Sequence, residues 1–196
     1  MTAAPLASRL QRRHRKGLTL FGALMALTLF AGAVIGAVTL YNTAQENQDR
    51  NDAQALLTTL TVAVKQIHQG APTYGTGSLV GLLDQRGAIP AGARQTTDTT
   101  TTTGGVTTTT TTVSIGHPFG SNVTVVGAGT GFEITFNGLE RENCAMMLDP
   151  YAGQRPGGGG LQGVEVGGTD VPLPMTPASI GTACTAASNN VEFQFE

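Results

Sequence analysis

The chain has 196 residues, which is enough for one domain of modest size. Its formal net charge is −2, but 5 of its 11 basic residues lie within the first 17 residues, which contain no acid. The other 6 basic residues and all 13 acidic residues give residues 18–196 a net charge of −7. A segment with this excess of negative charge is a poor binder of nucleic acid, and no nucleic-acid partner is expected.

The first predicted element is a basic leader peptide, residues 1–17, which ends at Lys16 and Gly17. Basic residues directly before an apolar run favour an N-terminus that stays on the inner side of a membrane. We therefore expect the N-terminus inside and the C-terminus outside.

An apolar run follows at once, from Leu18 to Tyr41, and these 24 residues carry no charge. As a helix the run would be about 36 Å long, enough to cross a bilayer with some tilt. It is longer than the apolar region of a secretory signal peptide, and no convincing cleavage site follows it. It therefore predicts a single membrane-spanning helix that carries an exported domain.

Small residues within this run are candidate positions for helix packing. Gly32 and Gly36 form a G-x-x-x-G pair, which allows two helices to approach closely. The alternative is that glycine is simply common in membrane helices. Together with Gly22, these two glycines are the candidate helix-packing residues.

Residues 42–70 continue as an amphipathic helix. One apolar stripe recurs at helical spacing; it consists of Ala53, Leu56, Leu57, Leu60, Ala63, Val64 and Ile67. Gly70 and Pro72 end the pattern, so one continuous helix from Leu18 to about Gln69 is expected. Its one-sided second half requires a surface to pack on, which must come from the C-terminal region.

Residues 71–196 are predicted to form a globular head built mainly from short strands. Alternating apolar residues predict strands at Asn122–Val126, Phe132–Gly138 and Asn190–Phe195. A short helix is expected over Leu139–Asp149, and Asn137-Gly138 is a turn signal. Residues 157–160, which are all glycine, and the prolines at 172, 174 and 177 indicate loops.

Threonine dominates residues 95–113 around a Gly104-Gly105 pair. Threonine is β-branched and favours strands, and two glycines suit a hairpin turn. Nothing in the segment can fill a core, however, which is typical of a low-complexity loop. The segment is therefore either a surface loop or a hairpin.

The two cysteines, Cys144 and Cys184, lie far along the chain. The apolar run implies export to an oxidising compartment, where one disulfide is the natural interpretation. Two unrelated free thiols are the alternative. A disulfide closing a loop of about 40 residues would stabilise the fold by roughly 4 kcal/mol in the chain-entropy model.

Signals for catalysis, metals and cofactors are absent from the sequence. The three histidines, His14, His68 and His117, are isolated, and no pair has metal-ligand spacing. The glycine-rich stretches lack the lysine of a phosphate-binding loop. We therefore expect no enzyme, no catalytic residue, no metal site and no cofactor.

The junction at Lys16-Gly17-Leu18 resembles the class III signal of type IV prepilins. This resemblance implies cleavage after Gly17 by a prepilin peptidase and N-methylation of Leu18, and the apolar helix would later pack inside a filament. One position departs from the family pattern, because Gly22 occupies the fifth mature position, where a glutamate is usual. This departure favours a minor subunit.

The C-terminal part, with "GHPFGSNVTV", "FEITFNGLERENCAMML" and "TACTAASNNVEFQFE", is similar to type IVb pilins, the family of toxin-coregulated and plasmid-encoded thin pili. The similarity implies an α+β fold, with a long N-terminal helix packed on a C-terminal antiparallel sheet. It also implies a disulfide between Cys144 on a short helix and Cys184 before the last strand.

The expected function is that of a structural subunit of a bacterial type IVb pilus, serving adhesion, aggregation or conjugative contact. Its partners would be copies of itself, the prepilin peptidase, the pilus assembly machinery and the inner membrane. It would reside in the inner membrane before assembly and in the extracellular pilus afterwards. One alternative is a minor pilin or a type II secretion pseudopilin, and another is an uncleaved, membrane-anchored periplasmic binding module.

Overall fold

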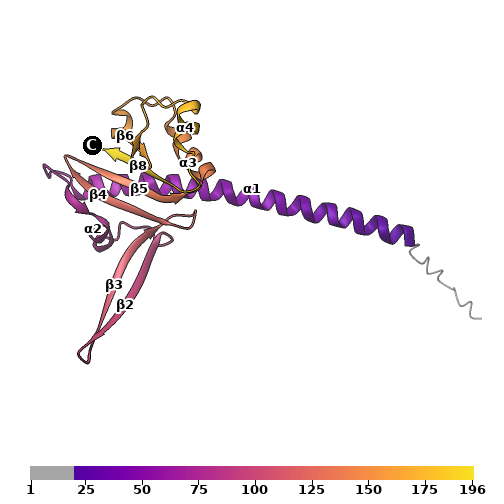
Figure 1. The fold of residues 1–196 in the computed structure, drawn as a ribbon, viewed down its shortest axis with the longest axis horizontal. Coiled ribbons are helices and arrows are strands. Elements are labelled where there is room, and N and C mark those ends of the chain that lie inside the picture. The colour runs from indigo at the N-terminus through magenta and orange to yellow at the C-terminus, as the bar shows by residue number, and fades with distance from the viewer. Residues whose placement is uncertain (1–19) are drawn as a thin grey trace, which may run out of the picture. The chain divides into compact units, whose positions relative to one another are not determined.

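The computed structural model describes residues 20–196, so Lys16, Gly17 and Leu18 lie outside the described residues. The chain divides into two compact units, Met1–Ala44 and Gln45–Glu196. The helix α1 (Leu20–Ile67) is continuous and contributes residues to both units (Figure 1).

The first unit consists, as far as it is described, of the beginning of α1. Its side chains are almost all exposed from residue 21 to residue 44. The hydroxyl groups of Thr28 and Thr39 donate hydrogen bonds to the carbonyl oxygens of Met25, at 2.9 Å, and Ile35, at 2.7 Å. These hydroxyls are thus satisfied within the helix, as an apolar environment requires.

The second unit combines the rest of α1 with one antiparallel sheet and short helices. In chain order its further elements are β1 (Gly75–Ser78), α2 (Val80–Gln85), β2 (Arg94–Thr103), β3 (Val106–Gly116), β4 (Asn122–Gly129), β5 (Gly131–Leu139), α3 (Arg141–Leu148), η1 (Asp149–Tyr151), η2 (Gly158–Gly160), β6 (Leu161–Val166), β7 (Thr169–Asp170), α4 (Pro177–Ala183) and β8 (Asn189–Phe195).

The sheet has the strand order β2-β3-β4-β5-β8-β6-β7, and β1 pairs with β4 off this path. Every pairing is antiparallel. The C-terminal strand β8 therefore lies inside the sheet, between β5 and β6. The C-terminal end of the chain is therefore held by strand pairing on both sides.

Buried and half-exposed side chains alternate along the central strands, so one face of the sheet is buried and the other is half-exposed. Phe132, Ile134 and Phe136 of β5 point into the core, as do Val191 and Phe193 of β8. The predicted stripe of α1 packs on this face and joins the same core cluster, with Ile67 only partly buried. Six of the seven stripe residues are buried. The sheet therefore provides the surface that the amphipathic half of the helix requires.

The fold is therefore the predicted combination of a long N-terminal helix and an antiparallel sheet. All three expected strands are present, and the expected short helix is α3. The turn expected at Asn137-Gly138 is wrong, because both residues lie within β5. Gly138 has a φ of 71° and lies where the β5–β8 register shifts, so its conformation forms a bulge rather than a chain reversal.

Residues 95–113 form most of a hairpin, β2–β3, rather than a loop. The two strands pair without interruption from Arg94–Ile115 to Thr103–Val106. β3 joins the sheet only through Ile115 and Gly116, because β1 occupies the edge of β4 farther along. The hairpin consequently projects from the sheet (Figure 1).

Candidate functional site

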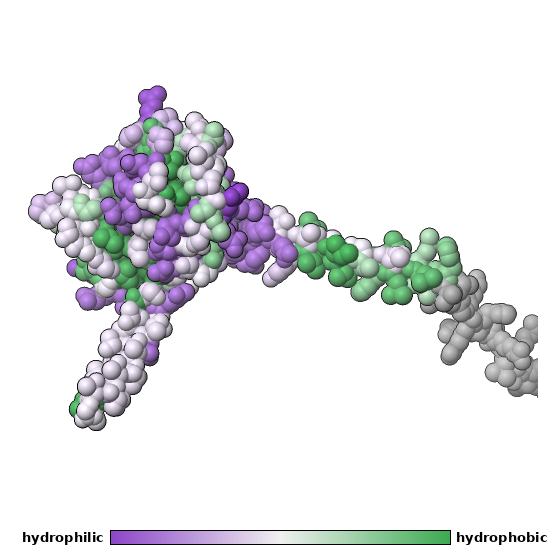
Figure 2. Space-filling view, in the orientation of Figure 1, coloured by the Kyte–Doolittle hydropathy of each residue, from purple (hydrophilic) through white to green (hydrophobic). Residues whose placement is uncertain are grey.

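Two regions stand out as candidate functional surfaces: the apolar start of α1 and the region around the disulfide. The side chains of the apolar start, residues 21–41, are almost all exposed. Figure 2 shows hydrophobic residues along the visible side of this stretch. Its exposed large side chains are Phe21, Leu24, Met25, Leu27, Leu29, Phe30, Val34, Ile35, Val38, Leu40 and Tyr41.

Of the described helices, only α1 is long and apolar enough to cross a membrane. An exposed apolar surface of this extent is unusual for a soluble monomer and indicates a partner, either lipid or protein. The apolar start of α1 is thus suited both to a bilayer and to packing against other helices.

The candidate packing glycines lie within this apolar start. A side chain placed at Gly32 or Gly36 would meet no other atom within 4 Å. Neither glycine is therefore needed to make room for a neighbouring side chain or for another described segment of the chain. Gly22 also lies in α1, in the first turns of its described part.

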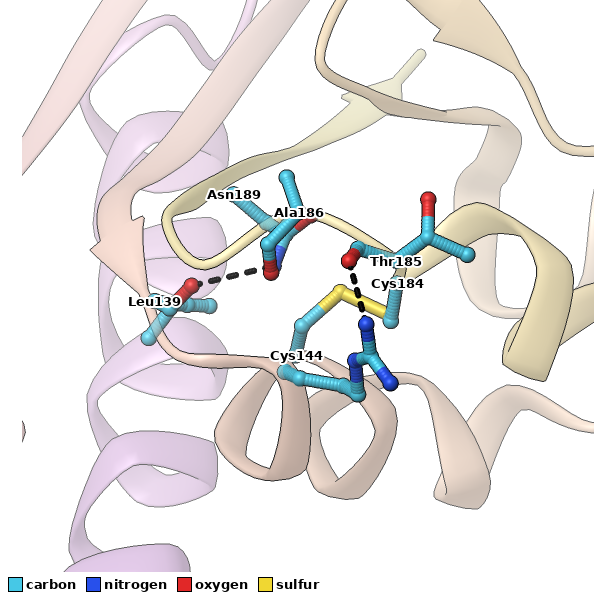
Figure 3. Close-up of a disulfide and its surroundings, with 7 residues drawn as sticks. Leu139, Cys144, Cys184, Thr185, Ala186 and Asn189 are labelled. Atoms are coloured by element: carbon cyan, nitrogen blue, oxygen red, sulfur yellow. Dashed lines mark hydrogen bonds between the residues drawn. A yellow bond between two sulfur atoms is a disulfide. The ribbon is translucent and has the colours of Figure 1, made fainter.

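The predicted disulfide joins Cys144 on α3 to Cys184 at the end of α4, across a sequence separation of 40 residues and a Cα–Cα distance of 5.8 Å (Figure 3). Both cysteines are completely buried, and the described chain has no free thiol. The bond therefore connects two short helices that contribute only a few core residues of their own.

Polar contacts around the disulfide fix the same two segments. The guanidinium of Arg141 donates a hydrogen bond to the carbonyl oxygen of Thr185 at 2.6 Å. The side-chain amide of Asn189, which is buried, donates to the carbonyl oxygens of Leu139, at 3.2 Å, and Ala186, at 3.0 Å (Figure 3). These bonds give hydrogen-bond partners to carbonyl groups at the end of β5 and in the connection between α4 and β8.

The sequence signals for α4 are local. Thr176 and Ser179 form a capping box, in which each side chain accepts from the backbone N–H of the other residue, and Pro177 occupies the first turn. The prolines had indicated only a loop here. The threonine and serine three residues apart were the signal that would have predicted this helix.

Carboxylates gather on the half-exposed face of the sheet. The side-chain amide of Gln194 donates to Glu165, at 2.8 Å, and to Glu192, at 3.1 Å. Partial burial, and then the neighbouring charges of Glu192 and Glu165, raise the pKa of Glu133 above its usual value. This face is acidic, in keeping with the net charge of the chain.

His117 is buried at the base of the hairpin and is the one buried histidine among the described residues. Its Nε2 lies 2.9 Å from the carbonyl oxygen of Asn137 and donates to it. Burial lowers the pKa of His117, although the hydrogen bond to Asn137 partly offsets this effect. The imidazole is thus favoured in its neutral form, which suits a structural role in the core.

Within residues 20–196 no group of three or more His, Cys, Asp or Glu side chains could hold a metal ion. The cavity at the hairpin base, about 430 Å³, is lined by His117, Asp52 and mostly small or apolar residues.

Comparison with known proteins finds one matching family and a similar solved structure. A family model described as Bundlin matches residues 42–195. The fold resembles the crystal structure of TcpA, a type IV pilin from Vibrio cholerae El Tor biotype, with a TM-score of 0.52 and 14% sequence identity. That match covers 76% of this chain and 99% of the other. No curated protein sequence matches the chain.

Proposed function

The chain belongs to the Bundlin family and is a type IV pilus subunit, and from that premise we propose that it polymerises through the apolar start of α1. In this proposal it is a structural subunit of a type IVb pilus that serves adhesion, aggregation or conjugative contact. The observation that carries the proposal is the exposure of a long, uncharged helix surface on a chain whose head already has a complete core.

In this proposal the apolar start of α1 is used twice, first in the membrane and then in the filament. In the first stage α1 anchors the precursor in the inner membrane, with the basic leader inside. In the second stage the apolar starts of neighbouring copies pack together in the filament. Removing apolar side chains from water, by lipid first and by other copies later, favours both stages.

Processing at the leader would separate the two stages. A prepilin peptidase would cut after Gly17 and leave Leu18 as an N-methylated first residue. The cut would remove every basic charge of Lys16 and the residues before it, and leave a chain with a net charge of −7. Assembly machinery of the cell would then extract the helix from the membrane.

A minor pilin or a type II secretion pseudopilin is the second candidate, and Gly22 favours it. The fifth mature residue would carry no carboxylate, so a neighbour's N-terminal amine would find no partner there. An uncleaved, membrane-anchored periplasmic binding module is the third interpretation, and it requires neither cleavage nor a polymer.

Substitution at the processing position tests the proposal against the uncleaved anchor. In the Gly17→Phe variant we expect a precursor that keeps its leader, remains in the membrane and yields no surface filaments. Lys16→Arg is the matched control, because it keeps the charge of the leader and leaves Gly17 in place. Normal filaments from Gly17→Phe would overturn the proposed processing.

A further inference from the structure

The threonine ribbon is residues 96–113 of β2 and β3. Apart from Val113 at its base, which packs against the core, neither the core nor the proposed helix packing uses it. Every β2 residue is exposed, and so is every β3 residue from Val106 to Thr112. Both faces of this exposed part of the ribbon therefore meet solvent. Figure 2 shows the ribbon standing clear of the rest of the head in that view.

The direction of the ribbon's backbone groups follows from its turn. Gly104 and Gly105 have φ values of 60° and 82°, as a two-residue type I′ turn requires. Thr103 and Val106, which flank such a turn, form a hydrogen-bonded pair, and the pairs then alternate along the ladder. At the far end the N–H of Gly116 donates to the carbonyl oxygen of Ala93 at 2.7 Å, which agrees with this alternation.

The side chains give the same alternation independently. Thr100 and Thr109 share a hydrogen bond of 3.3 Å, and Thr102 and Thr107 share one of 3.2 Å. Such short contacts between side chains are typical of the pairs that exchange no backbone hydrogen bonds. The backbone N–H and C=O groups of these residues therefore point outward, away from the partner strand.

Both edges of the ribbon are consequently open within the described chain. β2 is the terminal strand of the sheet order. On the other side, β3 pairs with β4 only at Ile115 and Gly116. A two-stranded ribbon with two open edges and no packed face is only marginally stable in water by itself.

The ribbon also lacks the features with which proteins usually block an open edge. Residues 95–113 contain no lysine, no arginine and no proline, and the β2–β3 register has no bulge. Their one charged residue is Asp98, which accepts a hydrogen bond from the hydroxyl of Thr111 at 2.6 Å. The edge is thus long, regular and nearly uncharged, which favours strand addition.

We propose that the open edges of the threonine ribbon pair with the ribbon of a neighbouring copy of this chain, adding strand to strand between subunits. This inference rests on the proposed function, since a filament places many copies side by side. Each copy carries two different open edges, so β2 of one copy can pair with β3 of the next. A head-to-tail contact of this kind can be repeated from copy to copy, and it generates an open helical polymer where the rotation between copies does not close a ring.

Charge favours a second copy at this site over contact elsewhere on the head. Outside the ribbon, residues 18–196 hold 6 basic and 12 acidic residues, a net charge of −6, which opposes close approach of two copies. The ribbon itself contributes only the charge of Asp98. It is therefore a surface on which two copies can meet with little repulsion.

Hydrogen exchange of the filament protein tests the inference, with sheared filaments compared against the same subunits dispersed in detergent. We expect ribbon amides, Thr100 and Thr109 among them, to exchange about tenfold or more slowly in filaments. Amides of the core strand β5 serve as the internal control and should change little. Equal exchange of the ribbon in both states would overturn the inference.

Two substitutions at one position sharpen the test. Thr100→Pro removes an N–H that points outward and that the ribbon itself does not use, whereas Thr100→Val keeps that N–H and the β-branched shape. We expect filaments of the proline variant to lose the ribbon's protection and to dissociate at a lower detergent concentration. Filaments of the valine variant should behave as wild type, and proline filaments with full protection would contradict the pairing.

The two proposals fail in different ways. Wild-type filaments whose ribbon exchanges freely would overturn strand addition and leave the pilus subunit intact. A wild-type chain that never leaves the membrane and forms no filament would overturn polymerisation, and the ribbon contact with it. The wild-type comparison needs no substitution, so a variant that fails to fold cannot obscure the result.

Discussion

The two halves of α1 belong to one unbroken helix and yet have opposite surroundings. In the first half, Leu27 is 65% exposed, and apolar side chains surround the helix on all sides. In the second half, Leu57 is 1% exposed and lies in the stripe that packs on the sheet. Leucine thus occupies both environments, and the helical backbone is the same in both.

The difference shows that the pattern of apolar residues, rather than helix formation, determines what each half contacts. A single stripe is matched to one surface, and the sheet of the same chain provides it. An apolar surface on all sides cannot be covered by one sheet face, and the described chain offers no other cover. Its partner must therefore come from a membrane or from other molecules.

Removal of the disulfide should have the largest effect, and only on the head. We expect the Cys144→Ser, Cys184→Ser double variant to lose about 4 kcal/mol of the free energy of unfolding, since the crosslink constrains a loop of about 40 residues. Chemical denaturation of the full-length protein in detergent measures this loss. Membrane insertion of the variant should be normal; failure to insert would mean that the two regions are not independent.

Truncating one leucine in each half is the most direct way to compare them. Leu57→Ala should lower the free energy of unfolding of the head by about 3 kcal/mol, because it leaves a cavity in the core. Leu27→Ala should leave the head unchanged and weaken the filament instead. Denaturation curves and filament dissociation in detergent provide the two readouts. A head destabilised equally by both variants would contradict the separation.

Adding bulk to the small residues of the first half should have a smaller effect, confined to assembly. Gly32→Leu and Gly36→Leu fill space that is open in the single chain, so the head should keep its thermal stability. If helices approach closely at these glycines, filament yield should fall several-fold, since close contact depends on small residues. Ala31→Leu is the control on another side of the helix. Unchanged yield would support the view that these glycines are merely common in membrane helices.

The smallest effect should come from titration of His117 in the head. Burial lowers the pKa of His117, so the unfolded chain binds the proton more readily than the folded chain. The stability contributed by neutral His117 is complete above a pH of about 6.5 and declines as the pH falls toward the lowered pKa. Thermal unfolding of wild type and His117→Gln should therefore converge as the pH is lowered from about 7 to about 5.5. A difference independent of pH would contradict this assignment.

The long helix, its buried stripe and the strands β4, β5 and β8 could be predicted from the sequence, because each shows a clear apolar period. β6 was missed because Gly163 interrupts its short pattern, and β1 because its sequence, Gly-Thr-Gly-Ser, has no apolar residue. Their pairing is decided by neighbouring strands, which local sequence does not reveal.

The candidate site was predictable to different degrees in its two regions. The disulfide follows from two cysteines in an exported chain, whereas the contacts of Arg141 and Asn189 depend on how α3 and the last loop meet. For the threonine segment the sequence supported a loop and a hairpin equally, since threonine favours strands but fills no core. The cleavage at Gly17, the methylation of Leu18 and the packing role of the glycines remain predictions.

The measurement that tests the central claim most directly is the intact mass and N-terminal sequence of protein sheared from the cell surface, with and without reductant. We predict a chain that begins at a methylated Leu18 and gains two hydrogen atoms on reduction, from the Cys144–Cys184 bond. A chain that still begins near Met1 and occurs only in membranes would contradict the account and indicate a static anchor.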